Sequence, residues 1–556
     1  MSGQAGYGGG TRGDRVTGWC MTAIAVMAAM PIFGIRMIGR EGIAVLSLPL
    51  IAAIICVLVA ELMWERPTFR GVRRLVTADQ EHEARKYCRA MSLFGVATAV
   101  LLMLLIMFLR PTLYGDSYEL VGSVVTLIAV LPALIFLCAS GARRGYLRAR
   151  GGKAELIIAS FFQNVLLFVL PFVIGRILSK YGTKVDALLR TESYAAVYGA
   201  IGAMIGMDVA CLVSYLILSI GSIKYRTTSF LTIRSSRGRG GYPFLSADGL
   251  IPAGFLAIFL FDTWRYFHTA VPKAAEEGEK TKILADQAVE QVSQSGILPD
   301  WGGYMGVVFL PTLCLAILLT LPFLKAIYRI HARYLRDDRY SVQDRLAGMM
   351  RRMMIIVLPV SFVVSGLAGP IVSLLCGKPD DALKNAFRLQ AAGVPIVTTL
   401  IVLSILFTKL GGKRAVLVSA VFGVIVHVVV VLLLSKGGHG LYPYVIAHLA
   451  GTAVMLVVTA FLLSASLSYR QEWLHGVAIP TLCAVLAALP SFALGGVFVS
   501  VIGEGLTILL LTAVGLFLYM TLLTILHGVT EYELHRIPGG KLFAGLSRVT
   551  GRNRWE

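Results

Sequence analysis

Charged residues are scarce in this chain, and long apolar blocks stand in their place. Of its 556 residues only 15% are Asp, Glu, Lys or Arg, 57% are hydrophobic, and the mean hydropathy is +0.77. Soluble domains carry roughly a quarter charged residues, so the composition excludes a soluble globular protein. Many apolar blocks reach the ~20 residues that a helix needs to cross the hydrocarbon core. Because hydrocarbon offers backbone groups no water, these blocks predict membrane-spanning helices.

The chain also lacks the residue patterns of metal sites and soluble enzymes. Its eight cysteines are scattered singly, without a C-x-x-C pair or a Cys/His pairing at metal-ligand spacing, which argues against disulfides and zinc. No phosphate-binding G-x-x-x-x-G-K-S/T, H-E-x-x-H or G-x-S-x-G occurs. We therefore expect no catalytic residues, no metal and no cofactor, and a protein that is not an enzyme.

Acidic residues are fewer than basic ones, 31 against 51, which gives a net charge of +20. Such an excess is also found in nucleic-acid-binding proteins. In a membrane protein it is explained by basic cytoplasmic loops and by contact with anionic lipid head groups. We therefore expect anionic membrane lipids as partners and no nucleic acid.

The apolar blocks predict about fourteen transmembrane helices in an all-α, polytopic fold. Their expected positions are 16–36, 42–64, 92–109, 118–141, 155–175, 194–220, 247–268, 303–325, 353–375, 391–408, 415–434, 441–466, 474–495 and 502–527. Lys and Arg concentrate on alternate loops, beginning with the N-terminal segment. The positive-inside rule then places both termini in the cytoplasm of a multi-pass cell-membrane protein.

The sequence contains signs of an internal repeat. Gly151-Gly152-Lys153 follows the fourth predicted span, and Gly411-Gly412-Lys413 follows the tenth. A basic amphipathic stretch at 70–89 has a counterpart at 333–352. Two six-helix lobes in the same orientation are predicted, as in parallel-repeat transporters. The expected boundaries are 1–232 for the first lobe, 245–466 for the second, and 467–556 for two further spans and a basic tail.

Several short motifs occur in a recognisable order along the chain. They are Arg36-Met37-Ile38-Gly39-Arg40-Glu41-Gly42 after the first span, an amphipathic helix at 75–91, Arg144-Gly145-Tyr146, Asp262-Thr263, and the stretch ending Leu374-Leu375-Cys376-Gly377. In these features the chain resembles the stage V sporulation protein B and polysaccharide-export branch of the multidrug/oligosaccharidyl-lipid/polysaccharide (MOP) exporter superfamily. That superfamily also contains the lipid II flippases and the MATE multidrug exporters.

The chain departs from this family in places. Gln163-Asn164 is followed by Leu167 where the family often has Arg, and several arginines occupy 66–74, where the family is mostly apolar or small. His427 stands where relatives often have Lys, and the predicted eleventh span lacks the Asn and Asp of sodium-dependent members. A sodium site is therefore not indicated.

Ionisable residues inside spans are the candidate site residues, because an isolated charge there is costly. Asp262 and Arg265 lie three residues apart, on one face of a helix. They form either an ion pair that neutralises itself or part of a cavity in which Arg265 binds phosphate oxygens. Arg36 and Arg40 are either interfacial arginines or, as the resemblance to lipid II flippases implies, part of a cationic cavity.

Further candidates lie near the second and sixth spans. Arg66 and Arg70 are either a basic flank of the second span or an entrance for a pyrophosphate head group. Glu61, Asp208 and Asp262 are candidates for ion coupling, although a hydrogen bond to a neighbouring helix is the alternative for Glu61 and Asp208. Gly202 and Gly206 form a G-x-x-x-G pair, which close helix packing explains.

Three functions fit these observations. The first is a flippase that moves a polyprenyl-pyrophosphate-linked saccharide, for peptidoglycan or an exopolysaccharide, by alternating access; wall- or polysaccharide-synthesis enzymes would be its partners. The second is a MATE-type, cation-coupled multidrug antiporter, a class that usually has twelve helices. The third is a membrane glycosyltransferase or ligase, which usually needs acidic metal-binding motifs in its outer loops. The arginines favour the first.

Overall fold

The computed structural model describes residues 34–59, 64–114, 124–190, 194–224, 254, 257–269, 297–336, 339–377, 380–435, 440–469 and 471–529. Every regular element in these residues is a helix. Residues 16–33 of the first predicted span, the lobe boundary at 232–245 and Glu61 lie outside the described ranges.

Eleven helical segments of the described chain are long and apolar enough to cross a membrane. Their outward faces are strongly apolar: Phe108 is 81% exposed and Val501 is 75% exposed. Large exposed hydrophobic side chains in such numbers are tolerated where lipid replaces water. The predicted all-α, multi-pass class is confirmed, while the count of fourteen spans stays a prediction.

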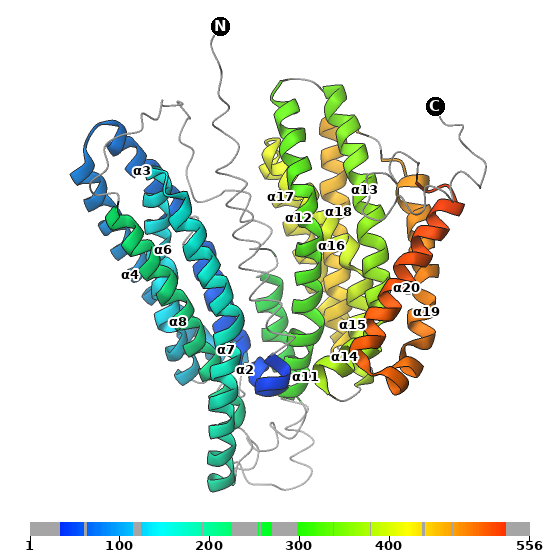
Figure 1. Ribbon diagram of the computed structural model, residues 1–556, viewed down its shortest axis with the longest axis horizontal. Helices are drawn as coiled ribbons and strands as arrows, with labels where there is room; N and C mark the ends of the chain where they lie inside the picture. The colour runs from blue at the N-terminus through cyan, green and yellow to red at the C-terminus, as the bar shows by residue number, and fades with distance from the viewer. Residues whose placement is uncertain are drawn as a thin grey trace. The chain divides into compact units, whose positions relative to one another are not determined.

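The chain divides into two compact units, Met1–Gly306 and Val307–Glu556. The described helices of unit 1 are α2 (Ile35–Val59), α3 (Arg66–Thr77), α4 (Glu81–Tyr114), α6 (Val124–Arg150), α7 (Lys153–Leu189), α8 (Tyr194–Lys224), the helix 257–269 and α11 (Ile297–Gly303). Within this unit, α3 lies at one end of the bundle, and α11 with the first turns of α2 lies at the opposite end (Figure 1). We call these the α3 end and the α11 end.

Close packing of α7 against α8 relies on glycine. A methyl group at Gly202 would lie 2.7 Å from the carbonyl oxygen of Ile174, and one at Gly206 would overlap the backbone of Pro171. Small residues let helix backbones approach closely in a membrane. The packing role predicted for the G-x-x-x-G pair is therefore confirmed.

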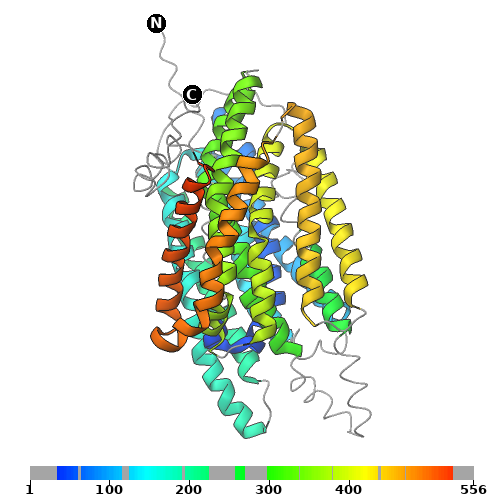
Figure 2. The ribbon, with the colours of Figure 1, turned by 90° about the vertical axis from the view of Figure 1, so that its right-hand side faces the viewer.

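Unit 2 contains α12 (Leu310–Tyr334), α13 (Arg339–Gly366), α14 (Ala368–Cys376), α15 (Asp381–Ala392), α16 (Val394–Lys409), α17 (Lys413–Leu434), α18 (Tyr442–Leu467), α19 (Ile479–Ile502) and α20 (Glu504–Ile525). Two π-helical turns, η6 (Tyr304–Phe309) and η8 (Leu474–Ala478), precede α12 and α19. Figure 2 shows α19 and α20 side by side, and both pack on α13.

The two Gly-Gly-Lys segments adopt the same turn. Gly151 and Gly411 have φ values of 81° and 97°, which only glycine adopts without strain. The N–H of Gly152 donates to the Leu147 carbonyl over 2.8 Å, and that of Gly412 donates to Phe407 over 2.9 Å. Each turn ends one helix with a bond typical of helix C-termini. This shared geometry supports the internal repeat.

Candidate functional site

The α11 end of unit 1 contains a buried aromatic cluster around Trp301. The Trp301 ring stacks on Tyr266 with centroids 4.9 Å apart, and meets the edge of Phe267 at 5.9 Å. Phe259 lies 6.1 Å away on the same helix, 257–269. Trp301 and Phe267 are completely buried, and stacked or edge-to-face rings stabilise such contacts. The cluster therefore packs α11 against the helix 257–269.

Tyr114 extends this cluster to α2 and α4. Its ring meets Phe267 edge-on at 4.8 Å, and its hydroxyl lies 3.5 Å from the Ser47 hydroxyl. Tyr114, the last residue of α4, is fully buried. Four helices thus converge at this end: α2, α4, 257–269 and α11.

A direct backbone contact joins α11 to α2. A methyl group at Gly302 would overlap the carbonyl oxygen of Arg40, so only glycine permits this approach. The sequence predicts a loop before residue 303, whereas the structure contains α11 and the Trp301 cluster there. The spacing of aromatic residues at 259, 266 and 267, followed by 301 and 304, was the available signal.

Asp262 and Arg265 lie on the helix that Trp301 packs against. Asp262 is 3% exposed and shares the buried face of this helix with Phe259 and Tyr266. Arg265 is half-buried. A carboxylate and a guanidinium in a membrane-spanning segment are retained where polar partners meet them. Both residues thus lie on the helix whose Tyr266 stacks on Trp301 of α11, and their role stays a prediction.

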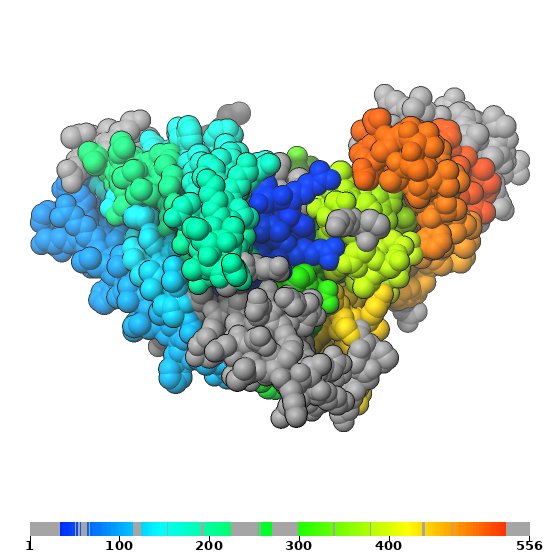
Figure 3. Space-filling view, turned by 90° about the horizontal axis from the view of Figure 1, so that it is seen from below, coloured from blue at the N-terminus to red at the C-terminus, as the bar shows by residue number. Residues whose placement is uncertain are grey.

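Arg36 and Arg40 flank a break in α2 at Gly39. Gly39 has φ 78° and ψ 169°, so the helix kinks there, with Arg36 before the kink and Arg40 after it. Arg36 is exposed and Arg40 is half-buried. Seen from this end, the first turns of α2 reach the surface (dark blue in Figure 3). Arg40 and Asp262 lie on the two helices that α11 contacts, α2 and the helix 257–269. Arg36 precedes the kink and is exposed.

The α3 end contains the other predicted arginines. Arg66 begins α3 and its side chain is not described, while Arg70 is exposed. Glu65, which the sequence interpretation missed, is buried and pairs with Arg148 of α6. A second ion pair joins Arg150 to Glu81 of α4 at 3.1 Å. These pairs fasten α3 and α4 to the end of α6.

The Arg144-Gly145-Tyr146 motif has a structural role at the same end. A methyl group at Gly145 would lie 2.5 Å from the Glu65 carbonyl oxygen, so glycine allows α3 to reach α6. Arg144 donates a 2.5 Å hydrogen bond to Gln163 of α7, which also accepts from Ser214 of α8 at 3.0 Å. Gln163 therefore links α6, α7 and α8 through side-chain hydrogen bonds.

Asp208 of α8 lies deeper in this bundle. Its Oδ1 accepts a 2.7 Å hydrogen bond from the backbone N–H of Ala133. Pro132 interrupts the regular bonding of α6, which frees a neighbouring N–H for an outside acceptor. The alternative of a hydrogen bond to a neighbouring helix is thus observed for Asp208, and ion coupling through it stays a prediction.

The histidines of the predicted eleventh and twelfth spans lie in unit 2, at a glycine-mediated contact. A methyl group at Gly451 of α18 would lie 2.8 Å from the Gly423 carbonyl oxygen of α17 and 3.0 Å from His427 Cβ. His448 meets the ring of Phe309 edge-on at 5.3 Å. Both imidazoles are buried in this packing. Within the described ranges, no group of three or more His, Cys, Asp or Glu side chains is arranged to hold a metal.

Comparisons with known proteins find similarity at the level of the fold. No family model matches the chain, and no curated protein matches it by sequence. A multidrug resistance MATE family transporter of the MOP superfamily, in an inward-facing conformation, aligns with a TM-score of 0.54 at 15% identity, covering 81% of this chain and 94% of its own. The lipid II flippase MurJ, in an inward closed conformation, aligns with a TM-score of 0.53 at 12% identity, covering 93% of this chain and 98% of its own. The chain therefore has the fold shared by MATE transporters and the MurJ flippase.

Proposed function

We propose that this protein is a flippase for a polyprenyl-pyrophosphate-linked saccharide, acting by alternating access. The observation that supports this proposal most is that four helices converge at the α11 end of unit 1. There, Arg40 and Arg265 are carried on helices that α11 packs together. A pyrophosphate offers several acceptors to guanidinium groups, and each charge-assisted bond contributes about 1.5–3 kcal/mol.

The extent of the structural likeness is in accord with this proposal. The MurJ alignment covers 93% of the chain and the MATE alignment 81%. The sequence predicts two spans beyond twelve, at 474–495 and 502–527, and α19 and α20 cover most of these residues. The resemblance to the polysaccharide-export branch suggests lipid II or an exopolysaccharide precursor as the substrate, and wall- or polysaccharide-synthesis enzymes as partners.

A cation-coupled multidrug antiporter is the second candidate. It is favoured by the equally good TM-score of the MATE transporter and by Asp208, a carboxylate within a span. An antiporter of cationic drugs would use acidic groups in its substrate site, whereas the α11 end presents three arginines, Arg36, Arg40 and Arg265.

Arg265 provides the test. Arg265→Ala should abolish translocation of a labelled lipid-linked saccharide in vesicles, and Arg265→Lys should reduce it, because lysine retains the charge but loses the planar fork of donors. Asp262→Asn should impair it by changing the charge balance beside Arg265. Arg176→Ala, which removes an exposed arginine of α7, is the matched control and should transport normally.

Protein level in the membrane is measured alongside each variant. Wild-type translocation by a well-inserted Arg265→Ala protein would show that Arg265 is a structural member of an ion pair. Cation-driven drug efflux that depends on Asp208, without saccharide transport, would favour the antiporter.

A further inference from the structure

Unit 2 contains an arginine, Arg388, that has no role in the proposed transport site and no evident role in helix packing. Arg388 lies on α15, within the candidate span Asp381–Lys409. It is seven residues from the start of α15, about 10 Å along the helix axis. A guanidinium at this depth is costly to insert unless it reaches an anion or the interface.

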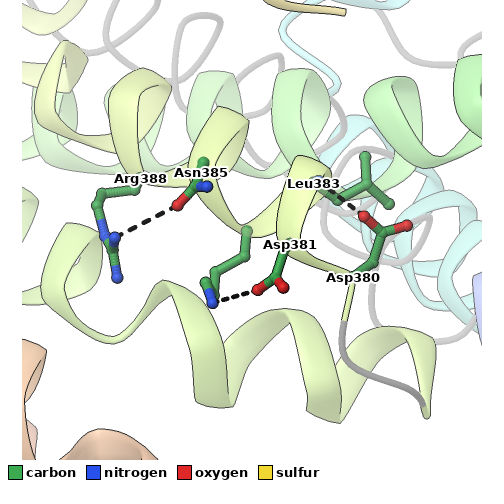
Figure 4. A network of polar contacts seen from close by, with 6 residues as sticks. Asp380, Asp381, Leu383, Asn385 and Arg388 are labelled. Atoms are coloured by element: carbon green, nitrogen blue, oxygen red, sulfur yellow. Dashed lines mark hydrogen bonds and ion pairs between the residues drawn. The ribbon is translucent and has the colours of Figure 1, made fainter.

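The acidic residues near Arg388 have other partners (Figure 4). Asp380 accepts a 3.0 Å hydrogen bond from the Leu383 N–H and caps α15. Asp381 pairs with Lys384. Arg388 itself donates to the side-chain oxygen of Asn385, at 3.4 Å. No carboxylate of the described chain pairs with it, and its buried Nε has no hydrogen-bond partner there.

An aromatic ring and a serine position the Arg388 guanidinium and backbone. The guanidinium carbon lies 4.2 Å from the centre of the Phe492 ring of α19, a cation–π contact. The Arg388 carbonyl accepts a 2.8 Å bond from the Ser365 hydroxyl of α13. Phe492 is 56% exposed, so the stacked guanidinium lies at the margin of the bundle, and its side-chain hydrogen bond within the described chain is the long contact with Asn385.

An apolar stripe on α19 leads away from this cation. At helical spacing from Phe492, α19 exposes Leu489, Leu486, Val485 and Leu482 by 54%, 40%, 40% and 53%. A stripe of this kind suits an acyl chain lying along the helix. A free inorganic anion would gain nothing from it, whereas an amphiphile with a phosphate above its chains would use both features.

We propose that Arg388, Phe492 and the exposed stripe of α19 form a binding site for one anionic glycerophospholipid. Its phosphate accepts from the Arg388 guanidinium, and an acyl chain covers Leu489 and Leu482. The lipid belongs to the leaflet on the side where α14 ends and α15 begins. This site lies within unit 2 and does not depend on the proposed function.

The test measures lipid binding to the purified full-length protein in uncharged detergent by native mass spectrometry. Phosphatidylglycerol should bind wild type about tenfold more tightly than Arg388→Gln, a difference of about 1.4 kcal/mol. Arg388→Lys should be intermediate, because an ammonium lacks the planar fork. Phe492→Leu keeps an apolar contact but removes the ring face, and should weaken binding about threefold.

Lys384→Gln is the matched control, since it removes the same charge four residues earlier on α15 and should bind as wild type does. Thermal unfolding of each variant establishes whether it is folded. If Arg388→Gln does not fold, Phe492→Leu tests the site independently. Equal affinity of Arg388→Gln and wild type would overturn the proposal. So would displacement by inorganic phosphate at similar concentrations, which indicates a free-anion site, or equal binding of phosphatidylcholine.

Discussion

At the scale of single residues, buried charges of unit 1 form ion pairs that hold neighbouring helices together. Glu65 of the α3 end is 4% exposed, and its partner Arg148 comes from the last turns of α6. Removing one member of a buried ion pair leaves the other without compensation, which costs far more than the pair itself contributes. Glu65 is therefore a structural residue whose loss should loosen α3.

We expect Glu65→Gln to lower the free energy of unfolding by about 3 kcal/mol, because Arg148 is left buried without its carboxylate. Denaturant titration of the purified protein measures this. Glu83→Gln is the control, since it removes a carboxylate from the exposed Lys86–Glu83 pair and should leave stability unchanged. Equal effects of the two substitutions would contradict the structural role of Glu65.

At the scale of elements, α11 decides the geometry of the candidate site. It packs on α2 through Gly302 and on the helix 257–269 through Trp301. The residues with predicted roles, Arg40, Asp262 and Arg265, lie on the two helices that α11 joins. The distance between these residues therefore depends on how α11 packs against the two helices, through contacts that involve none of these residues' own side chains.

Gly302→Ala tests this dependence. The added methyl overlaps the Arg40 carbonyl, so α11 must move away from α2. We expect a fall in thermal stability of several degrees, which corresponds to about 1–3 kcal/mol for overpacking, together with reduced transport.

Gly496→Ala is the matched control for this substitution, because a methyl there meets nothing within 4 Å in α19. Alanine also has the higher helix propensity, so this variant should be at least as stable as wild type. An unaltered melting temperature and normal transport for Gly302→Ala would show that the contact can relax at little cost.

At the scale of the whole molecule, the helices divide into two compact units, each with outward faces that are strongly apolar. The predicted topology puts both termini in the cytoplasm, from the distribution of Lys and Arg between loops. Arg234 and Glu277, in the two predicted loops on either side of the seventh span, lie outside the described ranges.

Fusions of a periplasm-active phosphatase at these two positions test the topology. Activity is expected at Glu277 alone, because the predicted seventh span separates the two loops. A fluorescent protein that matures only in the cytoplasm should give the opposite pattern. Phosphatase activity at Arg234 would show that the number of spans before it is wrong.

Much of the fold could be predicted because its signals are local. Apolar blocks located the helices, although α2 begins at Ile35 where the predicted span began at 42. Ile35 and Arg36 were predicted to end the first span, and residues 37–41, which include Arg40, to form the loop after it. They stay helical apart from Gly39, whose positive φ makes the kink that separates the two helical parts. The candidate site was less predictable, since the contacts of Glu65 with Arg148 and of Gly302 with Arg40 join residues distant in sequence.

The sequence by itself determined that this is a multi-pass helical membrane protein, because a bilayer requires long apolar segments with internally bonded backbones. It also predicted that ionisable residues such as Asp208 and Arg265 lie within those segments. Only the tertiary structure decided which residues meet: Glu65 with Arg148, Gly302 with the Arg40 backbone, and Arg388 with Phe492. These contacts join residues distant in sequence, and they depend on which faces of the helices pack together and how closely.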